Sequence, residues 1–168
     1  MTTRLDGSDA TVATLAGIAG RAANALPMWN AIGAFLVGTT VQRMREGESP
    51  AGAKWPASLR ARFEGGQTLI LSGRLMGDIH HLPLNTGVEV GTNLIYSAVH
   101  QYGAVIKAKT AKGLHWSYRS GSGTKHAVKQ QVTIPARPYV GLSASDRGGV
   151  IGIAENWILK AEPRGTAN

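Results

Sequence analysis

Apolar residues near the start of the chain recur at spacings of three and four: Val12, Leu15, Ala19, Ala22 and Leu26. This spacing places them on one face of a helix that ends near Pro27. A second apolar series runs from Met28 to the region of Gly47. Pro27 is tolerated in the first turn of that series because no backbone donor is needed there. The pattern predicts a bent or broken helical N-terminal half.

The next part of the chain is predicted to form turns and short elements. Residues 46–56, EGESPAGAKWP, contain two prolines and two glycines, and Trp55 is expected to pin this turn to the core. A short helix is predicted over residues 57–63. The alternation from Ile79 to Val90 around Asn85-Thr86-Gly87 predicts a β-hairpin.

The stretch that follows combines one ambiguous element with a projecting arm. Residues 94–102 are apolar and fit either a short helix or a strand, because periodicity does not separate the two in so short a run. Val105-Ile106 and the alternating residues 128–134 are predicted to pair as strands. Between them lies the tip KTAKGLHWSYRSGSGTKH, residues 109–126. We therefore predict a long β-hairpin arm at about 105–134.

Residues 143–146 are predicted to cap a last helix, which Pro163 and Gly165 stop. Its apolar face is formed by Val150, Ala154, Trp157, Ile158 and Ala161. The last five residues are expected to be frayed. Helices at both ends with hairpins between them predict the α+β class. We expect a single domain over 1–168, with a helical N-terminal half, a small antiparallel sheet carrying the hairpin arm, and a C-terminal helix.

Charge adds a partner class to this picture. Lysine and arginine number 18 against 10 acidic residues, a formal balance of +8. Residues 107–129 hold six of these basic side chains and no acidic one, so the arm must be exposed. Such a segment favours anionic partners, namely nucleic acid, membrane headgroups or acidic protein surfaces.

Aromatic residues are interleaved with the basic ones in the arm: Lys109, Lys112, Trp116, Tyr118 and Arg119. Stacking surfaces next to cations are typical of proteins that hold single strands or phosphate backbones. The simpler interpretation is a solvated hairpin that docks on a neighbouring subunit through its aromatic side chains. We favour docking, and nucleic-acid binding remains the alternative.

The sequence offers little for catalysis. The chain has no cysteine, so disulfides, thiolate chemistry and cysteine zinc sites are excluded. Its five histidines and ten acidic residues are scattered without metal-ligand or acid/base spacing. The most apolar stretch, Met28 to Val41, is too short to span a bilayer. We expect no enzyme activity, no bound metal or cofactor, no secretory signal and no membrane partner.

Four segments in order resemble the phage virion morphogenesis family, which includes tail-completion proteins of Mu-like and related tailed phages. They are SPAGAKWP at 49–56, LILSGRLMGDI at 69–79, VGTNLIYSAVHQYGA at 90–104 and IPARPYVGLSASD at 134–146. The third segment is the most specific, and the order of the four adds to the match. The connection between Trp55 and Leu69 is shorter than the resemblance leads us to expect, since a longer basic helical insert is missing there.

The resemblance implies a structural protein that completes the phage tail and helps join tail to head. It implies a homo-oligomeric ring, with six subunits suiting the tail end and twelve a neck position. Its expected partners are other copies of itself, the tail tube and neck or connector proteins, with DNA passing through the ring without sequence-specific binding. We expect assembly in the host cytoplasm and a final location in the virion at the head–tail junction.

Four motif residues are candidates for an interface with another subunit or partner: Arg74, His100, Gln101 and Arg137. Burying such groups without partners costs several kcal/mol, so each either pairs internally or meets another chain. Sequence alone leaves these two options open. An interface role is expected most for Arg137, because Pro135 and Pro138 hold it in an extended segment.

Overall fold

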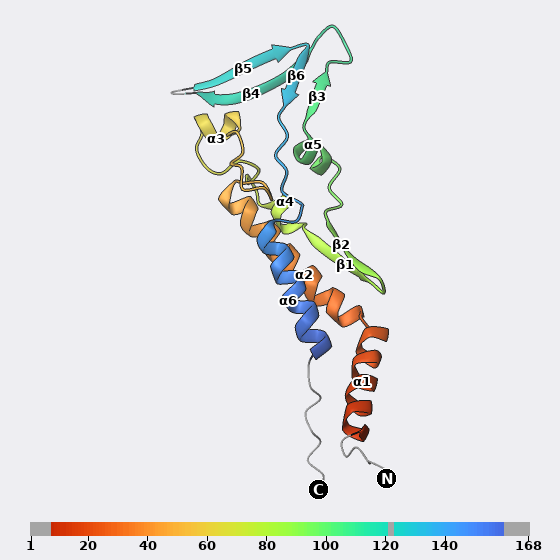
Figure 1. Ribbon diagram of the computed structural model, residues 1–168. Coiled ribbons are helices and arrows are strands. Elements are labelled where there is room, and N and C mark those ends of the chain that lie inside the picture. The colour runs from red at the N-terminus through yellow and green to blue at the C-terminus, as the bar shows by residue number, and fades with distance from the viewer. Residues whose placement is uncertain (1–7, 121–122, 160–168) are drawn as a thin grey trace, which may run out of the picture.

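The computed structural model describes residues 8–120 and 123–159. Two helices begin the chain, α1 (Ser8–Ala23) and α2 (Leu26–Glu46), and they meet at an angle in Figure 1. Pro27 lies in the first turn of α2, and Gly47 ends that helix in the left-handed conformation at φ 69°. The predicted broken helical half is confirmed, although Leu26 begins α2 instead of completing the face of α1.

The last helix, α6 (Ala144–Leu159), lies along α2 and runs in the opposite direction (Figure 1). The predicted C-terminal helix is confirmed as far as Leu159. Its predicted continuation to Ala161 and the expected fraying of the last five residues lie outside the described residues.

The predicted hairpin after residue 79 is confirmed as β1 (His80–Leu84) and β2 (Gly87–Gly91), joined antiparallel through Asn85 and Thr86. The hairpin packs against α2. This contact needs a glycine at position 33, because a Cβ there would lie 2.3 Å from a ring carbon of His81.

Three short helices connect these parts: α3 (Leu59–Phe63), α4 (Arg74–Gly77) and α5 (Ser97–Tyr102). The hydroxyl of Ser58 caps α3 by accepting a hydrogen bond from the backbone N–H of Ala61 at 3.1 Å. Residues 94–102, for which the sequence left helix and strand open, form a turn followed by α5.

The arm is a bent structure of two separate ladders. Its stem pairs β3 (Ala104–Lys107) with β6 (Gln131–Ile134), and its outer hairpin pairs β4 (Leu114–Ser120) with β5 (Gly123–Lys129). Figure 1 shows the outer hairpin turning aside from the stem and passing over α3. The α+β class is confirmed, with three two-stranded antiparallel ladders among the described residues where one small sheet was expected.

The predicted arm strands are only partly correct in extent. The stem pairing of Val105 with Thr133 and Ile106 with Val132 follows the prediction. Val128 was assigned to the same strand, but it pairs with His115 in the outer ladder. Most of the predicted tip therefore belongs to the two strands of the outer ladder. From His115 to Arg119, exposed and partly buried side chains alternate, as they do along a strand.

The hydrophobic core is small and lies at the centre of the molecule. Met44, Leu75, Ile79 and Tyr139 form its buried cluster. The predicted apolar face of α1 is not part of it, since Val12 and Leu15 remain 64% and 59% exposed. No helix within residues 8–120 and 123–159 is long and apolar enough to cross a membrane.

A candidate interface: the arginine–histidine groove and the basic arm

The centre of the molecule is organised by one extended segment, which runs from the end of β6 to the start of α6. Gln101 on α5 holds this segment with both ends of its amide. The Gln101 Nε2 donates to the carbonyl of Val140 at 2.9 Å, and its Oε1 accepts from the N–H groups of Tyr139 and Val140 at 3.0 and 3.2 Å. Gln101 is therefore paired inside the chain.

The turn around Trp55 is held by the same segment. The Trp55 indole Nε1 donates to the carbonyl of Pro138 at 2.9 Å, which confirms that this side chain pins the turn to the core. In return, the Arg137 Nε donates to the carbonyl of Pro56 at 2.9 Å. The Arg137 N–H also donates to the carbonyl of His100 at 2.7 Å.

Asp78 joins two more of the recognised segments. Its Oδ2 accepts hydrogen bonds from the hydroxyl of Thr92 and, at 3.0 Å, from the N–H of Asn93. The bond from Thr92 is the main cause that lowers the pKa of the Asp78 carboxyl below its ordinary value, and burial opposes it. The four sequence segments thus form one hydrogen-bonded framework.

Arg137 does not lie where we expected it. The side chain is only 6% exposed, although an outward position was predicted from its two flanking prolines. The segment is extended, but its pairing with the His100 carbonyl turns the guanidinium under the Pro56 turn. Burial lowers the pKa of Arg137 below its ordinary value.

Arg74, His100 and Arg137 meet in one groove of about 360 Å³, which we call the arginine–histidine groove. These three residues come from three different segments of the sequence, and the fold brings them together. No carboxylate is among the residues that line this groove: Ser58, Arg60, Leu69, Leu71, Ser72, Gly73, Arg74, Leu75, Tyr96, His100 and Arg137. Its charge is therefore positive, and its walls include apolar side chains.

His100, which lines this groove, also carries a ring nitrogen that is unpaired within the described chain. Its Nδ1 is buried and has no hydrogen-bond partner among the described residues. The Tyr96 ring packs against it edge-on, with ring centroids 6.0 Å apart and an interplanar angle of 79°. Burial lowers the pKa of His100 below its ordinary value, and the nearby charge of Arg137 lowers it further.

The arginines of the groove differ in how many hydrogen bonds their side chains form within the chain. Arg60 donates to the carbonyls of Gly65 and Ile70 at 3.2 and 3.0 Å and also to that of Gln67. Arg137 is held by Pro56. The side chain of Arg74 is exposed and forms no hydrogen bond or ion pair within the described ranges. Arg74 is therefore the guanidinium that remains available to a partner.

In the outer hairpin, Tyr118 and Arg119 are neighbours on β4 and lie on opposite faces, while Lys125, the partner of Tyr118, shares the face of that ring. Lys109 and Lys112 precede the hairpin. Trp116 and Tyr118 are partly buried, and the Tyr118 ring lies 5.8 Å from that of Phe63 on α3. The N–H of Arg119 donates to the Glu64 carboxylate at 2.9 Å. The outer hairpin is thus packed on α3 through its aromatic face.

The basic side chains of the arm remain in solvent. Lys109, Lys112 and Arg119 are all exposed. Opposite residues of an antiparallel pair share a face, so Thr124, the partner of Arg119, lies on the side away from Tyr118. The arm therefore presents a positively charged surface with no acidic side chain among its residues.

Sequence reasoning missed the most buried ion pair, which joins α2 to α6. Arg43 Nη1 lies 2.6 Å from Asp146 Oδ2, and Arg43 Nη2 donates to the carbonyl of Gly141 at 2.9 Å. Asp146 also accepts from the N–H of Ser143 at 2.8 Å. Burial raises the pKa of Asp146, but the hydrogen bonds from Ser143 and Arg43 outweigh it and hold the pKa below its ordinary value. The Ser143–Asp146 cap was recognisable in sequence, whereas its partner was not.

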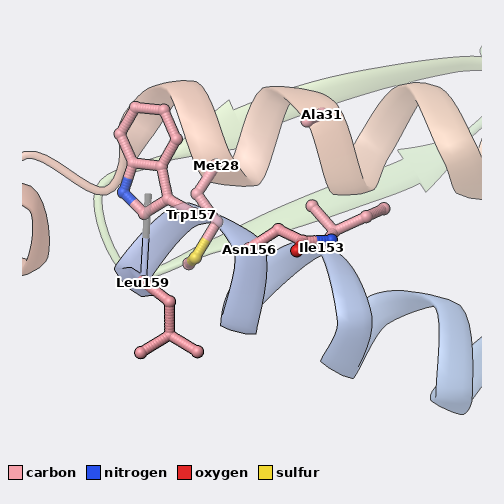
Figure 2. Close-up of a pocket in the computed structure, with 6 residues that line it drawn as sticks. All are labelled: Met28, Ala31, Ile153, Asn156, Trp157 and Leu159. Atoms are coloured by element: carbon pink, nitrogen blue, oxygen red, sulfur yellow. The ribbon is translucent and has the colours of Figure 1, made fainter. Parts of the chain in front are cut away.

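A second groove, of about 520 Å³, lies between α2 and α6. Figure 2 shows its lining residues: Met28, Ala31, Ile153, Asn156, Trp157 and Leu159. Sequence analysis placed Trp157 on the apolar face of the last helix, and the structure holds its ring near α1, with Nε1 donating to the carbonyl of Arg21 at 3.5 Å. No group of three histidine, aspartate or glutamate side chains within the described chain comes close enough to hold a metal ion.

Comparison with known proteins agrees with the four segments. The model of the phage virion morphogenesis family matches residues 8–159, which include every described residue. No curated protein and no solved structure matches the chain. The match extends beyond the quoted segments to the N-terminal helices, which resemble the family in type alone, and to α6. The chain therefore belongs to the phage virion morphogenesis family and has a structural role in phage assembly.

Proposed function

We propose that this protein completes the phage tail and helps to join it to the head, as a homo-oligomeric ring at the head–tail junction. The family match over residues 8–159 is the observation that carries the proposal. The ring contains six subunits if it sits at the tail end and twelve if it belongs to the neck. DNA passes through it without sequence-specific contacts, and the protein assembles in the host cytoplasm.

The exposed surface supports a role in assembly. Large apolar side chains remain in solvent on several elements, including Val12 and Leu15 on α1 and Tyr102 on α5. Exposed apolar surface of this kind marks places where another protein binds. The positively charged arm reaches beyond the small core, so it is placed to contact a tail-tube or neck protein with an acidic surface.

The direct test is a phage that lacks the gene for this protein, complemented from a plasmid. We expect lysates without complementation to contain filled heads and separate tails, counted by electron microscopy, and few infectious particles. Wild-type protein should restore joined particles. Joined, infectious particles in the absence of the protein contradict the proposal.

Nucleic-acid binding is the second candidate, and the charge of the arm is the observation that favours it. A protein that neutralises several phosphates loses affinity steeply and linearly with the logarithm of salt concentration. Fluorescence anisotropy with a labelled DNA duplex and a labelled single strand, from about 50 to 200 mM salt, measures this slope. A steep slope that disappears when Lys109, Lys112 and Arg119 are changed to Ala favours the second candidate. Weak binding with no such dependence favours the first.

A further inference from the structure

The arginine–histidine groove has the composition of a site for a carboxylate flanked by apolar groups. The side chain of Arg74 is exposed at this groove and forms no hydrogen bond or ion pair with any described residue, although, after the hydrogen bond from Thr92, its charge contributes to lowering the pKa of Asp78. No carboxylate is among the described residues that line the groove. His100 also lines the groove, and its buried Nδ1 has no hydrogen-bond partner among the described residues, which is costly for a polar atom in a native protein. Apolar side chains stand beside these groups, and Leu71 is 79% exposed.

The same chain carries a surface with the complementary composition on α6. Ile151, Glu155 and Leu159 follow at intervals of four residues, which places them in one stripe along the helix. Ile151 and Leu159 are 56% and 72% exposed, and Glu155 is exposed with no hydrogen bond or ion pair to any described residue. The stripe thus presents one unpaired carboxylate between two apolar side chains.

Three other described acidic residues already have partners within the chain. Glu48 pairs with Lys54, Glu64 accepts the N–H of Arg119, and Asp146 is buried against Arg43. Glu89 is exposed and unpaired within the described ranges, but it stands on the small hairpin β1/β2.

The apolar surface around Glu155 extends beyond this stripe. Leu159 also lines the second groove, and Figure 2 shows its side chain pointing away from α2. The apolar surface beside Glu155 therefore continues from the stripe into that groove.

We propose that the arginine–histidine groove of one copy receives Glu155 of a neighbouring copy, with Ile151 and Leu159 packing against the apolar wall. This inference rests on the self-assembly that the proposed function includes, and it names the two surfaces that meet. The two surfaces are different, so the contact is head-to-tail, and a bound pair of copies still has one free groove and one free stripe. Such contacts form a ring when the rotation between copies closes.

Charge reversal tests the pairing with the intact protein. We would measure self-association by sedimentation velocity for wild type, Arg74→Glu and Glu155→Arg, and confirm by thermal melting that each variant is folded. Each reversal places like charges together, so we expect self-association to weaken by about 100-fold or more. Arg45→Glu and Glu89→Arg are the matched controls, because they make the same charge changes at exposed positions outside both surfaces, and they should assemble like wild type.

Mixing the two charge-reversed variants is the decisive experiment. In an equimolar mixture, the arginine introduced at position 155 of one variant meets the glutamate introduced at position 74 of the other, while the remaining contacts keep the native pair. We expect the mixture to assemble to within about tenfold of wild type, although neither variant assembles alone. Misfolded chains do not recover on mixing, so this result also excludes a folding defect.

Several results overturn the pairing. They are a wild-type protein that stays monomeric up to about 100 μM, single reversals that assemble normally, and a mixture that fails to recover. Loss of binding to a labelled DNA duplex in Arg74→Glu with unchanged self-association assigns the groove to phosphate and also overturns it. Rings that follow the predicted pattern but are absent from the virion leave the pairing standing and contradict the proposed function instead.

Discussion

The guanidinium of Arg43 lies 2.6 Å from the carboxylate of Asp146, and the two side chains are only 8% and 2% exposed. This pair joins the last turn of α2 to the first turn of α6, which are about a hundred residues apart in sequence. Arg43 also donates to the carbonyl of Gly141, so it fixes the end of the extended segment that organises the centre. The framework of the recognised segments therefore depends on it.

Replacing one member of the pair should destabilise the protein strongly. Arg43→Met leaves a buried carboxylate without its cation, and such a change costs about 3–5 kcal/mol of unfolding free energy. Urea unfolding followed by circular dichroism measures the loss. Arg45→Met, two residues along the same helix at an exposed position, is the control and should change stability by less than about 0.5 kcal/mol. Equal midpoints for the two variants contradict a structural role for the pair.

The same carboxylate should make stability depend on acid. The pKa of Asp146 is lower in the folded protein than in the unfolded chain, so its contribution is fully present above the unfolded value of about 3.9 and is lost as pH falls through the folded value. Unfolding free energies measured between about pH 2 and 6 should fall less steeply for Asp146→Asn than for wild type. Parallel curves of unfolding free energy against pH for the two proteins contradict this prediction.

Arg137 and Arg74 should behave differently although they share a groove. Arg137→Ala removes a buried guanidinium and leaves the carbonyl of Pro56 without its donor, which costs about 1–3 kcal/mol. Arg74→Ala removes an exposed side chain and should change stability by less than about 0.5 kcal/mol. Complementation should fail for Arg74→Ala with an unchanged melting midpoint. A large fall in that midpoint contradicts an available Arg74.

These two arginines show how much of the structure can be predicted from the sequence alone. The four segments contain the residues of the framework and all lining residues of the groove except Ser58 and Arg60, and the hairpin at 79–90 followed from alternation and turn chemistry. The direction of the Arg137 side chain did not follow, because it depends on a backbone hydrogen bond to His100. Periodicity reports which face a residue occupies, and it carries no information on which distant carbonyl lies opposite.

The first helix shows a second limit of pattern. The spacing of Val12 and Leu15 predicted a helix with these residues on one apolar face, and the helix forms as predicted. That face remains exposed, because α1 is held to the end of α6 through Arg21, whose Nε donates to the carbonyl of Ile158 at 3.1 Å. An amphipathic pattern predicts that a face will be covered, but it does not say whether the cover is the same chain.

The arm should be dispensable for folding. Deleting residues 109–126 and closing the stem with a short turn removes β4 and the first half of β5 but leaves the core cluster of Met44, Leu75, Ile79 and Tyr139 intact. Loss of the ring contact between Tyr118 and Phe63 should lower the unfolding free energy by no more than about 1.5 kcal/mol. Thermal melting should remain cooperative, while joining fails in the complementation test. Loss of cooperative melting contradicts this account of the arm.

The most direct test of the central claim is a cryo-electron microscopy reconstruction of the head–tail junction in the intact phage particle. The account predicts a closed ring of copies of this chain at the junction, six or twelve in number, with the DNA path through its centre. The α6 stripe of each copy should lie in the arginine–histidine groove of the next, and the basic arms should contact a tail-tube or neck protein. A junction that contains no copy of this chain contradicts the account.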